Sequence, residues 1–175
     1  MKNFEVVGLL TYLNSDDAKK MQFTETSHYF TNKRNISKLE EYVKTLQDAE
    51  KQYKTPSEKF VEYETKKMEL VKPFFKKDEQ GVEVKNAQGN PLLVEGCEKE
   101  VTEIIIKLNE EYKETLEDRT SSLIKWEEFY ASETDSDFSI KKLPASALKQ
   151  SFVDSLTKGQ FDSIEPMLED DSASN

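Results

Sequence analysis

The chain has 175 residues, of which 34% are charged and 35% hydrophobic, and its formal net charge at pH 7 is −10. An acidic surface of this kind repels phosphate backbones and anionic lipids, so we expect no direct binding to nucleic acid or to a membrane. The single cysteine, Cys97, excludes an intramolecular disulfide.

The first residues, MKNFEVVGLLTYLN, contain one lysine and a short apolar run that is followed by acidic residues rather than by a cleavage site. The sequence therefore predicts no secretory signal peptide. No segment approaches the ~18 consecutive apolar residues of a membrane-spanning helix. We expect an intracellular protein or a component of a virus particle. Gly and Pro number only 5 each, which favours long helices over a compact α/β domain.

Two helices are predicted in the first 54 residues. The first is a short amphipathic segment, residues 4–13, that ends at the turn residues Asn14, Ser15 and Asp16. From Tyr29 to Tyr53 apolar residues then recur at heptad spacing, as in a helix that packs against another helix or a second chain. The candidate interface residues of this stripe are Ile36, Leu39, Val43 and Leu46.

The residues TPSE at 55–58 predict the start of another helix, with Thr55 as the cap, Pro56 at the first helical position and Glu58 completing a capping box. Pro73 predicts a kink or an early end of this helix. A further helix carries an apolar stripe from Val101 to Tyr112. Beyond the residues DRTSS we expect a separate short aromatic helix.

Between these helices, GVEVKNAQGNPLLVEG (residues 81–96) has the alternation and turn residues of a β-hairpin. The hairpin reverses the chain, so its flanking helices can pack as an antiparallel pair. Because an isolated hairpin is marginally stable in water, we expect it to recruit another strand, for which SIKKL (139–143) is a candidate. No internal repeat is evident.

The expected fold class is mainly α with a small β element: an antiparallel helical pair or bundle, a hairpin at about 81–96 and a short helical C-terminal region. The expected division is a helical domain at 1–131, an acidic linker at 132–137, a small strand and helix region at 138–168, and a disordered acidic tail at 169–175. The sequence leaves open whether residues 138–168 form an independent module.

No pattern in the sequence indicates a catalytic residue, a cofactor or a metal site. His28 is the only histidine, and Cys97 is followed by Glu98 and Glu100, which oppose thiolate formation. The segment ETDSDFSI has the acidic spacing that opens a calcium loop but lacks the glycine and glutamate that complete it. There is no glycine-rich phosphate loop. We therefore expect a protein that is not an enzyme.

The aromatic helix supplies the second set of candidate interface residues, because Trp and Tyr are enriched among interface anchors. An ordinary core position is the alternative for each of them. This set is Trp126, Phe129 and Tyr130.

Over residues 1–130 the chain has a short segment ending in LN, a long Lys/Glu-rich helix, a glycine-containing β insertion, a Glu-rich helix with the run EEYKE, and a Trp-containing helix. This order resembles a family of small uncharacterised proteins of tailed bacteriophages. The resemblance implies a phage origin, a place in the host cytoplasm or the virion, and a non-enzymatic role; it supplies no catalytic residues. The part from LPASALKQSFVDSL onward has no counterpart in that family.

Together these observations favour a non-catalytic protein–protein interaction or assembly component that binds itself or virion proteins. Two alternatives remain open. The first is an acidic inhibitor of a host nucleic-acid-binding protein, although the lysines throughout the helices make poor mimicry of nucleic acid. The second is a holdase chaperone, because the helix–hairpin–helix order resembles prefoldin subunits.

Overall fold

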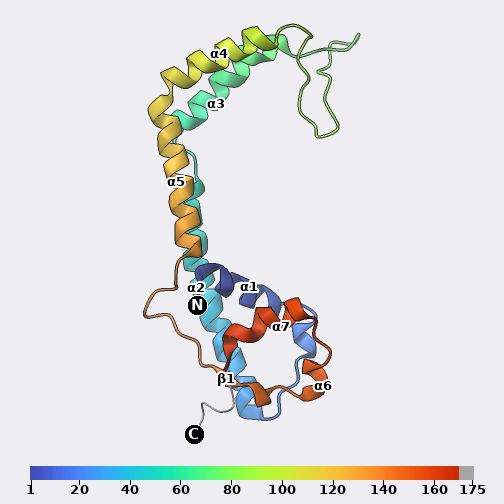
Figure 1. The fold of residues 1–175 in the computed structure, drawn as a ribbon, viewed down its shortest axis with the longest axis vertical. Coiled ribbons are helices and arrows are strands. Elements are labelled where there is room, and N and C mark those ends of the chain that lie inside the picture. Colours follow the sequence, from blue (N-terminus) through green and yellow to red (C-terminus); the bar gives the residue numbers. More distant parts are fainter. Residues whose placement is uncertain (170–175) are drawn as a thin grey trace. The chain divides into compact units, whose positions relative to one another are not determined.

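The computed structural model describes residues 1–169 and is mainly helical, with one two-stranded parallel sheet in this part of the chain (Figure 1). The expected fold class is therefore confirmed. The chain divides into two compact units. The first unit is Met1–Tyr53 with Lys125–Asn175, and the second unit is Lys54–Ile124. The two boundaries, at 53/54 and 124/125, both fall inside helices and not in the acidic segment 132–137.

The first unit contains most of the short elements and the longest helix. Its helices and strands are α1 (Asn3–Leu13), η1 (Ala18–Lys20), α2 (Thr26–Lys54), β1 (Leu143–Pro144), η3 (Ala145–Ala147), α6 (Gln150–Val153), α7 (Lys158–Ile164), η4 (Glu165–Met167) and β2 (Leu168–Glu169), where the last residue of α2 already belongs to the second unit. The second unit contains α3 (Glu58–Val71), η2 (Lys72–Phe74) and α4 (Glu98–Glu111). Helix α5 (Lys113–Ala131) contributes residues to both units.

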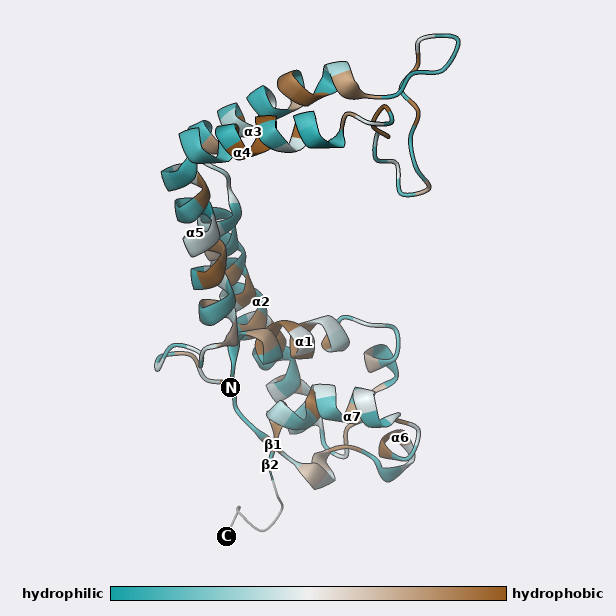
Figure 2. Cartoon of the chain, turned by 45° about the horizontal axis from the view of Figure 1, so that its top comes forward, coloured by the Kyte–Doolittle hydropathy of each residue, from teal (hydrophilic) through white to brown (hydrophobic). Residues whose placement is uncertain are grey.

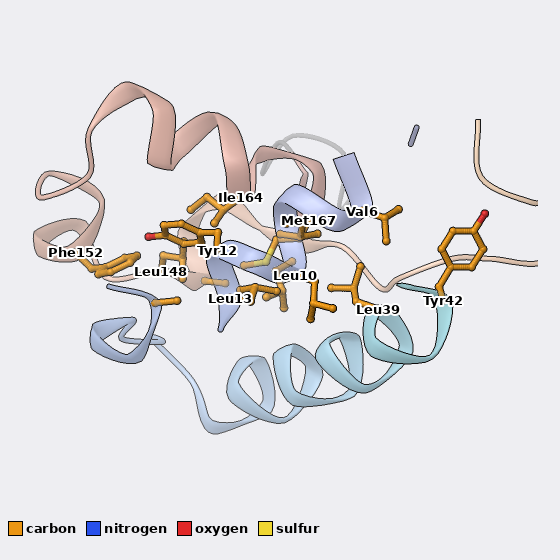
Figure 3. Packing of buried hydrophobic residues seen from close by; sticks show 14 of the residues in the cluster. Val6, Leu10, Tyr12, Leu13, Leu39, Tyr42, Leu148, Phe152, Ile164 and Met167 are labelled. Carbon is orange, nitrogen blue, oxygen red and sulfur yellow. The ribbon is translucent and has the colours of Figure 1, made fainter. Parts of the chain in front are cut away.

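The core of the first unit is built from both ends of the chain. Leu9 of α1 and Leu39 of α2 are completely buried, as are Ile164 and Met167. Figure 3 shows side chains of α1, α2 and the C-terminal segment meeting in one cluster. Residues 138–168 therefore share a hydrophobic core with the N-terminal helices.

The C-terminal segment is folded as short pieces. Leu143 pairs with Leu168 in the parallel sheet, so SIKKL contributes its last residue to a strand, but it does not extend the hairpin. The short helical C-terminal region expected from the sequence is present as α6 and α7. Of the tail predicted to be disordered, Glu169 lies in β2 and residues 170–175 lie outside the described residues.

Buried polar side chains attach the segment after α5 to α1 and α2. Tyr42 donates a hydrogen bond to Asn3 Oδ1 (2.8 Å), and the Asp135 amide donates to Tyr42 Oη (3.1 Å). Asn35 donates to the Lys141 carbonyl (2.8 Å) and accepts from the Lys141 amide (3.1 Å). We call residues 132–142 the strap, because these hydrogen bonds hold the segment against α2.

Several predicted helix ends need correction. The α3 cap is Ser57 and not Thr55, because the Ser57 side chain accepts a hydrogen bond from the Phe60 amide (3.2 Å). The predicted end near Pro73 is confirmed, since α3 stops at Val71 and a 3₁₀ turn follows. The separate aromatic helix after DRTSS is wrong, because α5 runs through those residues to Ala131.

Helices α3 and α4 of the second unit lie side by side as an antiparallel pair (Figures 1 and 2). Tyr63 is the one α3 side chain that is buried, and its hydroxyl donates to Asn109 Oδ1 of α4 (2.7 Å). Val101 and Leu108 form the buried stripe of α4. The predicted pairing of the two helices that flank the β insertion is therefore present.

Residues 74–97, which we call the tip, connect this pair. The predicted hairpin pairing exists as an isolated antiparallel bridge between Lys85 and Pro91. The hairpin pairs in addition with the residues just before it in the chain, since Phe75 forms an antiparallel bridge with Leu93 and Lys77 forms one with Glu83. The third strand proposed at SIKKL is therefore wrong.

Three backbone hydrogen bonds close a ring at the centre of the tip. The Lys76 amide donates to the Leu92 carbonyl (2.7 Å), the Leu92 amide to the Val84 carbonyl (2.8 Å), and the Val84 amide to the Lys76 carbonyl (2.8 Å). These residues are evenly spaced at eight-residue intervals along the chain. A short local repeat, which the sequence did not make evident, therefore organises the tip.

Two equivalent turns, 78–81 and 86–89, lie on either side of Val84. In each turn a side-chain oxygen, of Asp78 or Asn86, accepts two backbone amides, two and four residues ahead. Each turn ends at a glycine with positive φ: +79° at Gly81 and +83° at Gly89. Side chains with a Cβ rarely adopt this conformation, so glycine chemistry sets the shape of both turns.

The two kinds of glycine in this chain lead to opposite predictions for alanine substitution. Gly89→Ala is expected to destabilise the tip by about 1–2 kcal/mol, because the left-handed conformation strains a residue with a Cβ. Gly8→Ala is expected to stabilise the chain by about 0.5–1 kcal/mol, since Gly8 is helical with nothing within 4 Å of the added Cβ. Urea unfolding followed by circular dichroism, with amide exchange at residues 82–92, measures both effects. A stabilised Gly89→Ala variant would contradict the turn geometry.

Candidate interaction surfaces

The predicted interface residues of α2 face the core of the first unit. Leu39 and Leu46 are buried in its hydrophobic cluster, and Ile36 and Val43 are half-buried against that cluster. The buried stripe of α2 comprises Asn32, Asn35, Leu39, Tyr42 and Leu46. This buried stripe shares Leu39 and Leu46 with the predicted stripe. It also includes Asn35 and Tyr42, which contact the strap.

The predicted aromatic set also makes contacts within the chain. Trp126 is buried, and its ring stacks on Tyr130 with centroids 5.3 Å apart. Phe129 lies 5.9 Å from the Trp126 ring and 6.3 Å from Tyr53 of α2. Trp126 is therefore a core residue of the chain, which was the alternative to an interface position, whereas Phe129 and Tyr130 are half-buried.

The second unit has a different balance of buried and exposed apolar side chains. Among the residues that the structure describes, its buried hydrophobic side chains are Tyr63, Phe75, Val101 and Leu108. Its exposed large hydrophobic side chains are twice as many: Val61, Met68, Leu70, Val82, Leu92, Val94, Ile106 and Ile124. Sequence reasoning placed no candidate residue in this set, although Val82, Leu92 and Val94 belong to the predicted strands.

All of these exposed residues except Ile124, which lies on α5, belong to the helical pair or to the tip. Val61 and Met68 are seven residues apart on α3, which places them on one face. That face lies opposite Tyr63, the residue that contacts α4. In the tip, Val82 is the most exposed large hydrophobic residue at 59%. We call Val61, Met68, Val82, Leu92 and Val94 the outer apolar set.

Polar contacts also join α3 to the C-terminal end of α4. Lys66 pairs with Glu111 across the two helices, and this hydrogen bond raises the pKa of Lys66. Tyr112 donates to Glu62 (2.8 Å), which raises the pKa of the Tyr112 hydroxyl. Glu62 and Lys66 lie one residue before and three residues after Tyr63, so these contacts fall on the Tyr63 side of α3 and not on the side of Val61 and Met68.

A groove of about 870 Å³ is the second candidate surface, and it lies within the first unit. Its walls are the start of α1, the strap and the segment from α7 to β2. The apolar lining comprises Met1, Phe138, Ile140, Ala145, Phe161, Pro166 and Leu168, and the polar lining comprises Glu5, Thr134, Ser139, Lys142, Glu165 and Glu169. Sequence reasoning missed this groove, because its walls come from distant parts of the chain.

Within residues 1–169, no three His, Cys, Asp or Glu side chains lie close enough together to hold a metal ion. His28 lies with Nδ1 3.3 Å from Thr24 Oγ1. Cys97 is half-buried, and its thiol donates to the Val94 carbonyl (2.8 Å). The described helices include none with an apolar stretch long enough to cross a bilayer.

Comparisons with known proteins give no assignment. No protein-family model, no curated protein and no solved structure matches this chain.

Proposed function

We propose that this chain is a non-catalytic protein–protein interaction or assembly component, of the kind encoded by tailed bacteriophages, acting in the host cytoplasm or the virion. Its partner is a protein, either a second copy or a virion component. Its contact surface is the outer apolar set of the second unit: Val61, Met68, Val82, Leu92 and Val94.

The observation that carries this proposal is the excess of exposed over buried large apolar residues in Lys54–Ile124. In the first unit the same residue types are mostly buried. Burial of apolar area drives most protein association, at about 25 cal/mol per Å² removed from water. An apolar set at the end and side of a helical pair is therefore suited to contact another protein surface.

The test compares tagged wild-type chain with a Met68→Ser/Val82→Ser variant, each expressed in phage-infected cells of the native host. A second copy with a different tag is included so that self-association is detected. After nuclease treatment, quantitative mass spectrometry measures the proteins that co-purify. We expect the wild type to retain one partner, or its second copy, at 0.5 M salt. We expect the variant to lose about tenfold or more of it, as for substitution of interface anchors.

The matched control is Phe30→Ser in the first unit, because Phe30 is 56% exposed, close to Met68 at 54% and Val82 at 59%. This control is expected to retain the partner. Equal retention by the Met68→Ser/Val82→Ser variant would overturn the proposed surface. A basic nucleic-acid-binding partner that dissociates as salt rises would favour the inhibitor instead, since screening weakens exposed charge contacts.

A further inference from the structure

We propose that the groove of the first unit binds a short protein segment in which apolar side chains alternate with Lys or Arg. This site is separate from the outer apolar set, and neither proposal depends on the other. Its occupant follows from three features of the groove: its size, its apolar floor and its unbalanced charge.

The size of the groove suits several amino-acid side chains at once. Its volume of about 870 Å³ lies toward the upper end of the range for ligand sites. The strap forms one wall, and its backbone is held in place at Lys141 by Asn35 and at Ser139 by Lys38. Since these anchors lie on α2, the wall is pre-formed.

The apolar floor provides the first part of the recognition. Phe161 of α7 lines the groove and is 38% exposed, although its neighbour three residues on, Ile164, is completely buried. Phe138 also lines the groove, and its ring stacks on Tyr42 with centroids 4.2 Å apart. The Phe138 ring held against Tyr42 and the exposed Phe161 ring can together cover an aliphatic or aromatic side chain of a bound segment.

The charge of the lining provides the second part. Three carboxylates, Glu5, Glu165 and Glu169, line the groove beside the Lys142 ammonium, and the N-terminal ammonium of Met1 is paired with Glu133, which lies outside the lining. Glu5 accepts the Lys2 amide. In the described part of the chain, Glu165 and Glu169 take part in no salt bridge. The groove therefore favours a cation beside each apolar side chain and disfavours anions.

Other occupants fit this lining less well. The chain's own residues 170–175, DDSASN, add carboxylates and have no apolar side chain larger than alanine. A small polyamine would match the carboxylates but would leave Phe161 and Phe138 exposed to water. A basic segment with apolar side chains matches both parts of the lining.

The test uses three fluorescein-labelled nine-residue peptides and the full-length protein at 50 mM salt. The peptide sequences are KFKLKFKLK, its charge-reversed form EFELEFELE, and the polar form KSKGKSKGK. Fluorescence anisotropy measures the dissociation constant of each. We expect KFKLKFKLK to bind saturably with a dissociation constant below about 1 mM. We expect the dissociation constant of KSKGKSKGK to be about tenfold higher, and EFELEFELE not to bind.

Variants locate the binding and separate it from the net charge of the protein. Glu165→Gln/Glu169→Gln is expected to weaken binding of KFKLKFKLK by about three- to tenfold, since each exposed ion pair contributes only modestly to affinity. Phe161→Ser is expected to weaken it as well. The control Glu127→Gln/Glu128→Gln removes the same charge from exposed positions of α5 and is expected to leave the dissociation constant unchanged.

Three results would overturn the proposal. The first is the absence of KFKLKFKLK binding at the highest concentration. The second is equal weakening by the groove variant and the control, which would indicate attraction to the overall charge of −10. The third is tighter binding, by about tenfold, once residues 170–175 are deleted, which would identify the chain's own tail as the occupant. The Met68→Ser/Val82→Ser variant should bind the peptide normally.

Discussion

Ile164→Ala is expected to lower the free energy of unfolding by about 2–5 kcal/mol, the usual range for truncating a buried aliphatic side chain. Ile164 is completely buried on α7, which packs against α1. The loss should therefore reach the N-terminal helix, more than 150 residues away along the chain. Urea unfolding gives the energy, and amide exchange of residues 6–13 shows whether α1 loses protection.

The control is Ile106→Ala, which changes the same residue type in a helix where the side chain is 51% exposed. We expect a change within about 0.5 kcal/mol and no effect on α1. If Ile164→Ala destabilised only residues 138–168 and left α1 protected, those residues would be the independent module that the sequence left open. The shared core predicts the opposite result.

Local patterns were sufficient to predict most helices. The apolar spacing of residues 4–13 predicted α1, and Pro73 predicted the end of α3 because proline cannot donate the helical hydrogen bond. The cap was misassigned because Thr55 and Ser57 both have a side chain that can cap, and the choice depends on backbone conformation. Periodicity therefore predicts that a helix is present better than it predicts its first residue.

The buried face of α2 was predicted only in part from the sequence. Apolar spacing identified Leu39 and Leu46 but passed over Asn35, which is polar, and Tyr42, which lies outside the heptad register of the predicted stripe. Both are buried since they hydrogen-bond to the strap, which lies about a hundred residues further along the chain. A buried polar residue is explained only by its partner, and the partner is not local.

The same reason applies to the candidate surfaces. The outer apolar set could be read as strand and helix residues from the sequence, but their exposure depends on how few neighbours the second unit provides. The groove required α1, the strap and α7 to be brought together. Turn residues predicted the hairpin turn at 86–89, whereas the pairing with residues 74–78 depends on a repeat of the same turn eight residues earlier, at 78–81, which the alternation of apolar residues did not indicate.

Asn35→Leu is expected to destabilise the first unit by about 1–3 kcal/mol, because the amide and carbonyl of Lys141 both lose their partner. Leucine fills about the same space but has no hydrogen-bond donor or acceptor, so the fall in the free energy of unfolding reports the loss of these two hydrogen bonds. Amide exchange should accelerate at residues 139–142, where the strap is released. Ser37→Ala, at an exposed position of the same helix, is the control and should change stability by less than about 0.5 kcal/mol.

Asn35→Asp separates the two hydrogen bonds. An ionised carboxylate still accepts the Lys141 amide, but it faces the Lys141 carbonyl without a proton to donate. Burial and this carbonyl should raise the pKa of Asp at position 35 in the folded state above its unfolded value of about 3.9. The protonated form restores the donor. The variant should therefore approach wild-type stability below that unfolded value and lose it as pH rises through the folded pKa. A stability difference from wild type that is the same at pH 3.5 and pH 7 would show that Asn35 does not hold the strap through its amide donor.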